Sequence, residues 1–181
     1  LKTRRQALMA SNLGPIEKIF WLIEDAKRYG TLPFAGLARA GFIAVQILQS
    51  IVEIGIMTKE DYSRFMASIS TVSKRMAKHR VTMERSEFLN LYGHLRPGTY
   101  EITSPRYDEN PALYFDWTDP AFLEEVKSKA FTLDSGQKSE ISKVLELNSL
   151  KSDPTALFQF IKSAIELREE AKFEFSRNLS D

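Results

Sequence analysis

The sequence contains no cysteine among its 181 residues, which excludes disulfide bonds and thiolate chemistry. It also lacks an excess of charge of one sign, because 25 basic residues balance 24 acidic ones and the net charge is +1. Proteins that bind nucleic acid or a membrane surface usually carry a basic excess, so we expect neither partner. The absence of cysteine is typical of a cytoplasmic protein, and we expect that location.

The usual signatures of catalytic and cofactor sites are missing as well. The sequence has no Cys/His pattern with metal-ligand spacing, no glycine-rich phosphate loop and no nucleophile elbow. Its most apolar stretch, residues 34–57, is interrupted by Arg39, Gln46, Gln49 and Glu53. These polar residues favour a buried helix of a soluble protein over a membrane span.

Helical spacing of apolar residues dominates what is present. Hydrophobic residues make up 43% of the chain, enough to form a core, and no alternating strand pattern extends beyond a few residues. We therefore predict an all-α fold, an irregular bundle within a single domain over residues 1–181. About seven helices are expected, over residues 15–29, 33–54, 58–76, 83–92, 136–147, from 119 onward and from 154 onward.

Glycine and proline mark the expected helix ends. Pro15 and Pro33 suit the first turn of a helix, where no amide hydrogen is needed. Gly30 and Gly55 suit the position just after a helix. The second expected helix, from Pro33, is apolar on nearly every side, which predicts that it lies buried at the centre of the fold.

Residues 90–107 follow neither helical nor strand spacing. This stretch reads Asn-Leu-Tyr-Gly-His-Leu-Arg-Pro-Gly-Thr-Tyr-Glu-Ile-Thr-Ser-Pro-Arg-Tyr, and its glycines, prolines and hydrogen-bonding side chains are typical of a loop held in one conformation. We expect one long ordered loop over about residues 93–117. Tyr92, His94 and Tyr107 in or beside it are candidate ligand contacts.

Two arginines of this loop, Arg96 and Arg106, are the stronger candidates. A guanidinium group binds carboxylates and phosphates in a bidentate manner. The alternative is a structural arginine that ties the loop to helix ends or to Glu101. His94 has the same two interpretations, a general acid/base or substrate contact on one side and a structural histidine bonded to backbone on the other.

Arg39 lies within the apolar run at residues 34–42. A buried charge requires a partner. Glu24 and Asp25 are the nearest acidic candidates if the first two helices pack antiparallel, so we expect a buried structural ion pair. A role for Arg39 in binding an anion is the alternative.

Three stretches resemble the phosphoenolpyruvate synthase and pyruvate phosphate dikinase family. They are residues 92–102, Tyr-Gly-His-Leu-Arg-Pro-Gly-Thr-Tyr-Glu-Ile, residues 30–42, Gly-Thr-Leu-Pro-Phe-Ala-Gly-Leu-Ala-Arg-Ala-Gly-Phe, and residues 168–173, Arg-Glu-Glu-Ala-Lys-Phe. The Thr-Ser-His run that carries the phosphorylated histidine in this family is absent, and so is the nucleotide-binding part. The resemblance implies a helical middle region excised from a larger multidomain enzyme.

The resemblance, which extends to rifampin phosphotransferase, implies an ATP-dependent phosphotransferase that acts through a phosphohistidine outside these residues. ATP and Mg²⁺ would then serve other parts, and the neighbouring nucleotide-binding and phosphohistidine domains would be partners. The region itself would bind a small-molecule acceptor and carry no catalytic residue. Pyruvate, a drug-like hydroxyl compound and a sugar all remain open as the acceptor. The alternative function is a non-catalytic scaffold that positions neighbouring domains.

Overall fold

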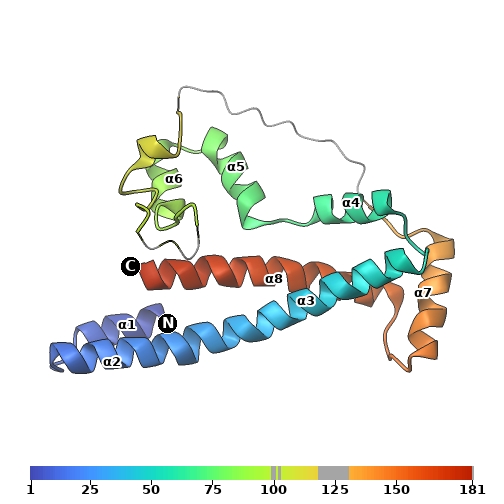
Figure 1. Cartoon of the computed structure of the whole chain (residues 1–181), viewed down its shortest axis with the longest axis horizontal. Coiled ribbons are helices and arrows are strands. Elements are labelled where there is room, and N and C mark those ends of the chain that lie inside the picture. The colour runs from blue at the N-terminus through green and yellow to red at the C-terminus, as the bar shows by residue number, and fades with distance from the viewer. Residues whose placement is uncertain (99–100, 102, 118–130, 181) are drawn as a thin grey trace. The chain divides into compact units, whose positions relative to one another are not determined.

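The computed structural model describes residues 1–98, 101, 103–117 and 131–180, and most of them are helical (Figure 1). Within these ranges no residue belongs to a β-strand, so the predicted all-α fold is confirmed. The α-helices are α1 (Lys2–Met9), α2 (Pro15–Ala26), α3 (Leu32–Glu53), α4 (Lys59–Ser68), α5 (Val72–Thr82), α6 (Arg85–Tyr92), α7 (Ser135–Leu147) and α8 (Pro154–Ser180). A π-helical turn, η1 (Lys27–Thr31), and a 3₁₀ turn, η2 (Pro111–Leu113), complete the described elements.

Side-chain caps begin several helices where the sequence predicted them. Thr58 accepts a hydrogen bond from the amide of Asp61 at 3.0 Å, and the Asp61 carboxylate accepts one from the Thr58 amide at 3.1 Å. Asp153 accepts from the amides of the second and third residues that follow it, at 2.8 and 3.0 Å, and Pro154 begins α8. Each cap satisfies amides that have no partner inside the helix. The start predicted at residues 119–120 lies outside the described residues.

The break predicted between Gly30 and Pro33 is wrong, because residues 15–53 form one continuous helical run (Figure 1). Pro33 has no amide hydrogen, and its ring crowds the carbonyl four residues earlier, that of Tyr29. The backbone widens at this point into the π turn, where the amide of Leu32 bonds to the carbonyl of Lys27. The proline therefore changes the local pitch and the helix continues.

Gly30 has a packing role inside this turn. It is buried, and a Cβ atom built on it would lie 2.2 Å from Cε2 of Phe175, in α8. A glycine is needed here because the phenyl ring approaches the backbone closely. The single helix predicted through Met76 is also divided, since Ile69 is extended at the end of α4 and α5 begins at Val72.

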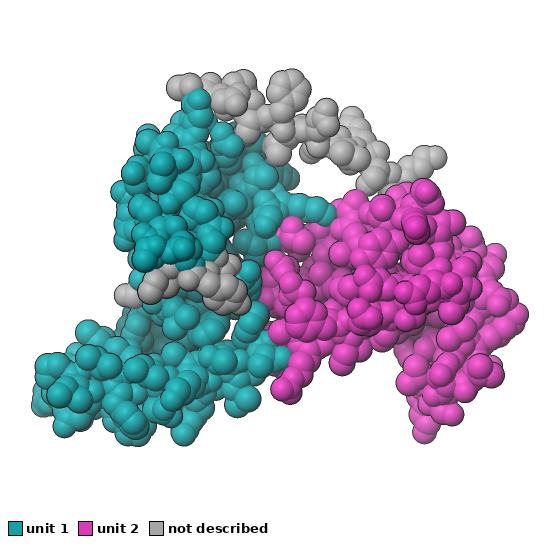
Figure 2. All heavy atoms as spheres, in the orientation of Figure 1, with its two compact units in different colours: residues 1–35, 72–124, 170–181 teal, residues 36–71, 125–169 magenta. Residues whose placement is uncertain are grey.

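The chain forms two compact units (Figure 2). Unit 1 comprises residues 1–35, 72–124 and 170–181, and unit 2 comprises residues 36–71 and 125–169. Helices α3 and α8 contribute residues to both. In unit 1 the buried aromatic residues Phe88, Tyr92 and Phe173 form the core.

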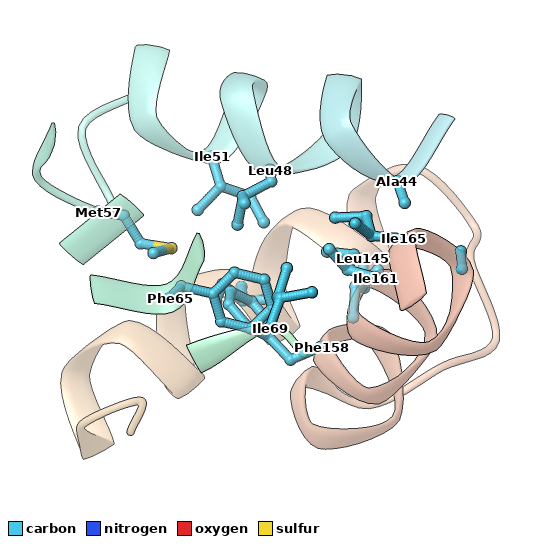
Figure 3. Close-up of a cluster of buried hydrophobic side chains, with 12 residues drawn as sticks. Ala44, Leu48, Ile51, Met57, Phe65, Ile69, Leu145, Phe158, Ile161 and Ile165 are labelled. Carbon is cyan, nitrogen blue, oxygen red and sulfur yellow. The ribbon is translucent and has the colours of Figure 1, made fainter. Parts of the chain in front are cut away.

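The core of unit 2 forms between α3, α4, α7 and α8 (Figure 3). Phe65 of α4 packs edge to face against Phe158 of α8, with ring centroids 5.3 Å apart. Such a pair adds about 0.5–1.5 kcal/mol beyond its buried area. The buried members are Ala44, Leu48, Ile51, Met57, Phe65, Ile69, Ile141, Leu145, Phe158, Ile161, Ala164 and Ile165.

Helix α3 buries one face, so the expectation that it would be covered on nearly every side is wrong. Its buried residues Gly41, Ala44, Leu48 and Ile51 repeat at helical spacing, while the neighbouring Phe42 is 60% exposed. By length and composition the run over residues 15–53 is apolar enough to cross a membrane. Core helices of soluble proteins have the same property, so this composition does not choose between the two environments.

Two helix ends give a matched stability prediction. Gly55 follows α3 with φ of 81° and Ser149 follows α7 with φ of 56°. An added Cβ at Gly55 meets no atom within 4 Å, so Gly55→Ala changes backbone energy alone and should cost about 1 kcal/mol. Ser149→Gly removes the cost of a positive φ for a residue with a side chain, so it should stabilise the folded state by up to about 1 kcal/mol. Urea unfolding measures both, and an unchanged midpoint for Gly55→Ala would contradict this account.

Candidate functional site: the loop over residues 93–117

Two backbone hydrogen bonds close the loop at its base. The amide of Tyr107 donates to the carbonyl of Leu95 at 2.9 Å, and the amide of Asp108 donates to the carbonyl of Gly93 at 3.1 Å. Gly93 ends α6 in a right-handed conformation, so its glycine is not required by φ. A Cβ on Gly93 would collide with the carbonyl oxygen of Leu89 and would lie 2.7 Å from Cβ of Asp108, and these close approaches explain the glycine.

Arg106 has structural partners on two sides. Its Nε donates to Oδ1 of Asp108 at 2.9 Å, and an Nη donates to the other oxygen of the same carboxylate. The second Nη donates to the carbonyl of Ser180, in the last turn of α8, at 2.9 Å. The guanidinium beside Asp108 lowers the pKa of that carboxyl group. These contacts agree with the structural interpretation of Arg106, in which the arginine ties the loop to a helix end.

Arg96 is bound less completely. Its Nε donates to the carbonyl of Ser104 at 2.9 Å, and the side chain is half-buried. Glu101, which was considered as a structural partner, accepts instead from the amide of Thr103 at 3.2 Å and from the hydroxyl of the same residue. These hydrogen bonds lower the pKa of Glu101. Within the described ranges the terminal nitrogens of Arg96 have no bonded partner, while the bond of Nε to Ser104 fixes the orientation of the guanidinium plane.

Tyr92 and His94 lie buried around Phe173 of α8. The Tyr92 ring is 5.7 Å from the Phe173 ring and the His94 ring is 4.9 Å from it. The Tyr92 hydroxyl forms a 2.9 Å hydrogen bond with Nδ1 of His79 on α5. Burial raises the pKa of the Tyr92 hydroxyl. Tyr92 belongs to the core of unit 1, and His94 is buried beside Phe173 of that core.

Tyr107 completes the set of candidates in the loop. Its ring packs against Phe115 with centroids 4.9 Å apart and against Tyr114 at 5.1 Å, and burial raises the pKa of its hydroxyl. Tyr114 donates in turn to the carbonyl of Pro105 at 2.9 Å. The aromatic residues of the loop thus hold its second half in a fixed conformation.

Arg39 belongs to unit 2, and its expected buried ion pair is wrong. Arg39 is exposed on α3. Asp25 is bound by Arg4 at 2.9 Å, and Glu24 by Lys27 at 2.8 Å. The expectation required an antiparallel pair of helices, and the continuous run through the π turn removes that arrangement.

Several residues that build this region were missed by sequence reasoning. His79, Ser180 and the ion pair of Arg75 with Glu170 come from elements far from the loop in sequence. No local pattern identifies them, because each contact depends on how α5 and α8 pack in unit 1. Asp108 was the accessible signal, since a carboxylate two residues from Arg106 can reach its guanidinium.

Comparisons with protein-family models, with curated proteins and with solved structures gave no match. Among the residues that the structure describes, no group of three histidine, cysteine, aspartate or glutamate side chains could hold a metal ion.

Removing Arg106 should weaken unit 1. Arg106→Ala deletes a bidentate pair with Asp108 and a bond to the Ser180 carbonyl, and partial exposure limits the loss to about 1–2 kcal/mol. Because the pKa of Asp108 is lowered on folding, the stabilisation is present above the unfolded pKa of about 4 and disappears as the pH falls through the folded pKa. Chemical unfolding at neutral pH and below pH 4 should show the difference between parent and variant shrinking in acid. A constant difference would exclude the carboxylate as the source.

The exposed arginine gives the opposite prediction. Arg39→Ala should change the free energy of unfolding by no more than about 0.5 kcal/mol, because the side chain is exposed on α3. Thermal unfolding of both arginine variants under one set of conditions makes the comparison. A large drop in melting temperature for Arg39→Ala would contradict the exposed position of Arg39 and would support the buried ion pair that the sequence predicted.

Proposed function

We propose that this chain is the helical middle part of an ATP-dependent phosphotransferase similar to phosphoenolpyruvate synthase, and that Arg96 in its loop binds the acceptor or the phosphoryl group in transfer. The resemblance of residues 92–102 to that family supports the assignment. The observation that most favours this site is the geometry of Arg96, because its Nε donates to the carbonyl of Ser104 at 2.9 Å.

A guanidinium oriented in this way suits an anion. Its two terminal nitrogens lie in one plane with Nε, so fixing Nε fixes the direction of the remaining donors. Charge-assisted bonds to a carboxylate or phosphate contribute about 1.5–3 kcal/mol each. The side chain is half-buried, which reduces competition from water and increases the strength of such a contact.

The other groups of the reaction belong to other parts of the proposed enzyme. A phosphohistidine would carry the phosphoryl group from ATP, with Mg²⁺, to the acceptor. The sequence has no glycine-rich phosphate loop, and the described residues offer no cluster of metal ligands. We therefore assign no step through ATP or Mg²⁺ to the residues of this chain.

A second candidate function, a non-catalytic scaffold that positions neighbouring domains, has its own support. Arg106 is engaged in structural contacts with Asp108 and with Ser180. Helix α2 also exposes large apolar side chains, with Ile16 83% and Phe20 54% exposed. Such a surface is typical of a region that packs against other protein.

The first test uses the chain itself and phosphoenolpyruvate, which carries both a carboxylate and a phosphate. Calorimetric titration should detect binding, and Arg96→Ala should weaken it by about 10- to 100-fold through the loss of a charge-assisted hydrogen bond. Arg28→Ala, which removes an exposed arginine from the π turn of the same unit, is the matched control and should bind as the parent does. If both variants bound phosphoenolpyruvate equally weakly, the effect would come from the loss of net charge and would give no evidence for a site at Arg96.

The two half-reactions of an enzyme that contains all parts separate the two functions. If Arg96 binds the acceptor, Arg96→Ala should leave phosphorylation of the distant histidine intact and abolish transfer onward. A scaffold role predicts that both steps persist, or that both decline together as the loop unfolds. The melting temperature distinguishes selective loss from unfolding.

A further inference from the structure

Unit 2 contains a pocket of about 530 Å³ between α3 and α7, and the pocket includes no residue of the loop in unit 1. Its volume lies in the range of small-molecule sites, about 300–1,000 Å³. Most of its lining is aliphatic. The α3 side includes Ile47 and Ile54, and the α7 side includes Ile141 and Val144.

The pocket is formed at the carboxyl ends of both helices. At the end of α3 the amide of Ile56 bonds to the carbonyl of Ile51 at 3.2 Å, and at the end of α7 the amide of Leu150 bonds to that of Leu145 at 2.9 Å. These bonds define a Schellman motif at each end, and all four residues line the pocket. The carboxyl end of a helix carries partial negative charge, which disfavours an anionic ligand.

The side chains of the lining give the remaining chemistry. Among the described residues that line the pocket none is charged, and the polar ones are Gln46, Ser50 and Asn148. The Gln46 amide donates through nitrogen to Gln49 at 3.0 Å, and the Asn148 amide donates to the carbonyl of Val144 at 2.8 Å. Each amide therefore keeps its oxygen as an acceptor and one further N–H as a donor. A ligand that matches this lining is neutral and largely apolar, and a donor group on it could bond to either amide oxygen.

We propose that the α3–α7 pocket is a binding site for a neutral, mostly apolar small molecule that carries a hydroxyl or N–H donor. The proposal does not depend on the phosphotransferase assignment, because it uses no residue of the loop. Ile54 and Leu150 are 57% and 56% exposed at the pocket and would be covered by such a ligand.

Fluorescence titration of the chain with N-phenylnaphthylamine, a neutral aromatic probe with one N–H donor, tests the proposal. The probe should bind saturably, with one molecule per chain. Val144→Glu places a carboxylate in the lining and should weaken binding by at least about tenfold, because the probe would have to desolvate that charge. Leu147→Glu is the matched control, since Leu147 lies on the same helix, is 88% exposed and is not in the lining.

A second variant and a second probe guard against misleading results. Ser50→Phe fills the pocket from the exposed edge of α3 and should also reduce binding, so it decides the matter if Val144→Glu fails to fold by circular dichroism. Anilinonaphthalenesulfonate has similar rings and a negative charge, and it should bind more weakly than the neutral probe.

Three results would overturn the proposal. The parent chain could fail to bind the neutral probe, or the Val144→Glu and Leu147→Glu variants could bind it equally, which would indicate general adsorption to apolar surface. In the third, the parent is a dimer that Val144→Glu converts to monomer, so that a second copy occupies the pocket. Sedimentation measurements on both proteins detect this last case.

Discussion

The last turns of α8 are the element on which unit 1 depends. Unit 1 is assembled from three segments far apart in sequence, and residues 170–180 contact both of the others. Phe173 packs against α6, and Phe175 packs against the π turn. The carbonyls of Asn178 and Ser180 accept hydrogen bonds from Arg5 of α1 and Arg106 of the loop. The final carbonyls of a helix lack partners within it, and positively charged donors suit its negative end.

This dependence explains which parts of the fold could be predicted from sequence. Helix starts at Thr58 and Asp153 and the stop at Gly55 follow from bonds between residues close in sequence, and they were correct. Gly30 and Pro33 carry similar local signals, yet the helix continues through them. A proline indicates that one backbone hydrogen bond is missing, and it does not say whether the chain reverses or widens into a π turn. The contact of Gly30 with Phe175 is a tertiary contact, and no pattern in the neighbouring sequence predicts it.

The candidate site also has features that the sequence predicts and features that it does not. Sequence spacing identified the irregular segment and its arginines, because glycine and proline density is a local property. It could not assign Arg106 to Ser180 or Tyr92 to His79, since those partners come from other helices. Arg39 was misjudged because its apolar neighbours in sequence suggested burial. Helix α3 buries one face, and Arg39 lies among its exposed residues.

The closed base of the loop has a consequence for how this protein can diverge. The bond between Tyr107 and Leu95 holds the two ends of the segment together, and Asp108 with Gly93 adds a second tie beside it. Sequence between these ends can change or lengthen at small entropic cost, because closure cost grows slowly with loop length. Homologous chains would then keep Arg106, which bonds to Asp108 and to Ser180, and could vary residues between the ends that make no such contact. The acceptor selectivity proposed for this loop could change there without remodelling the helices that support it.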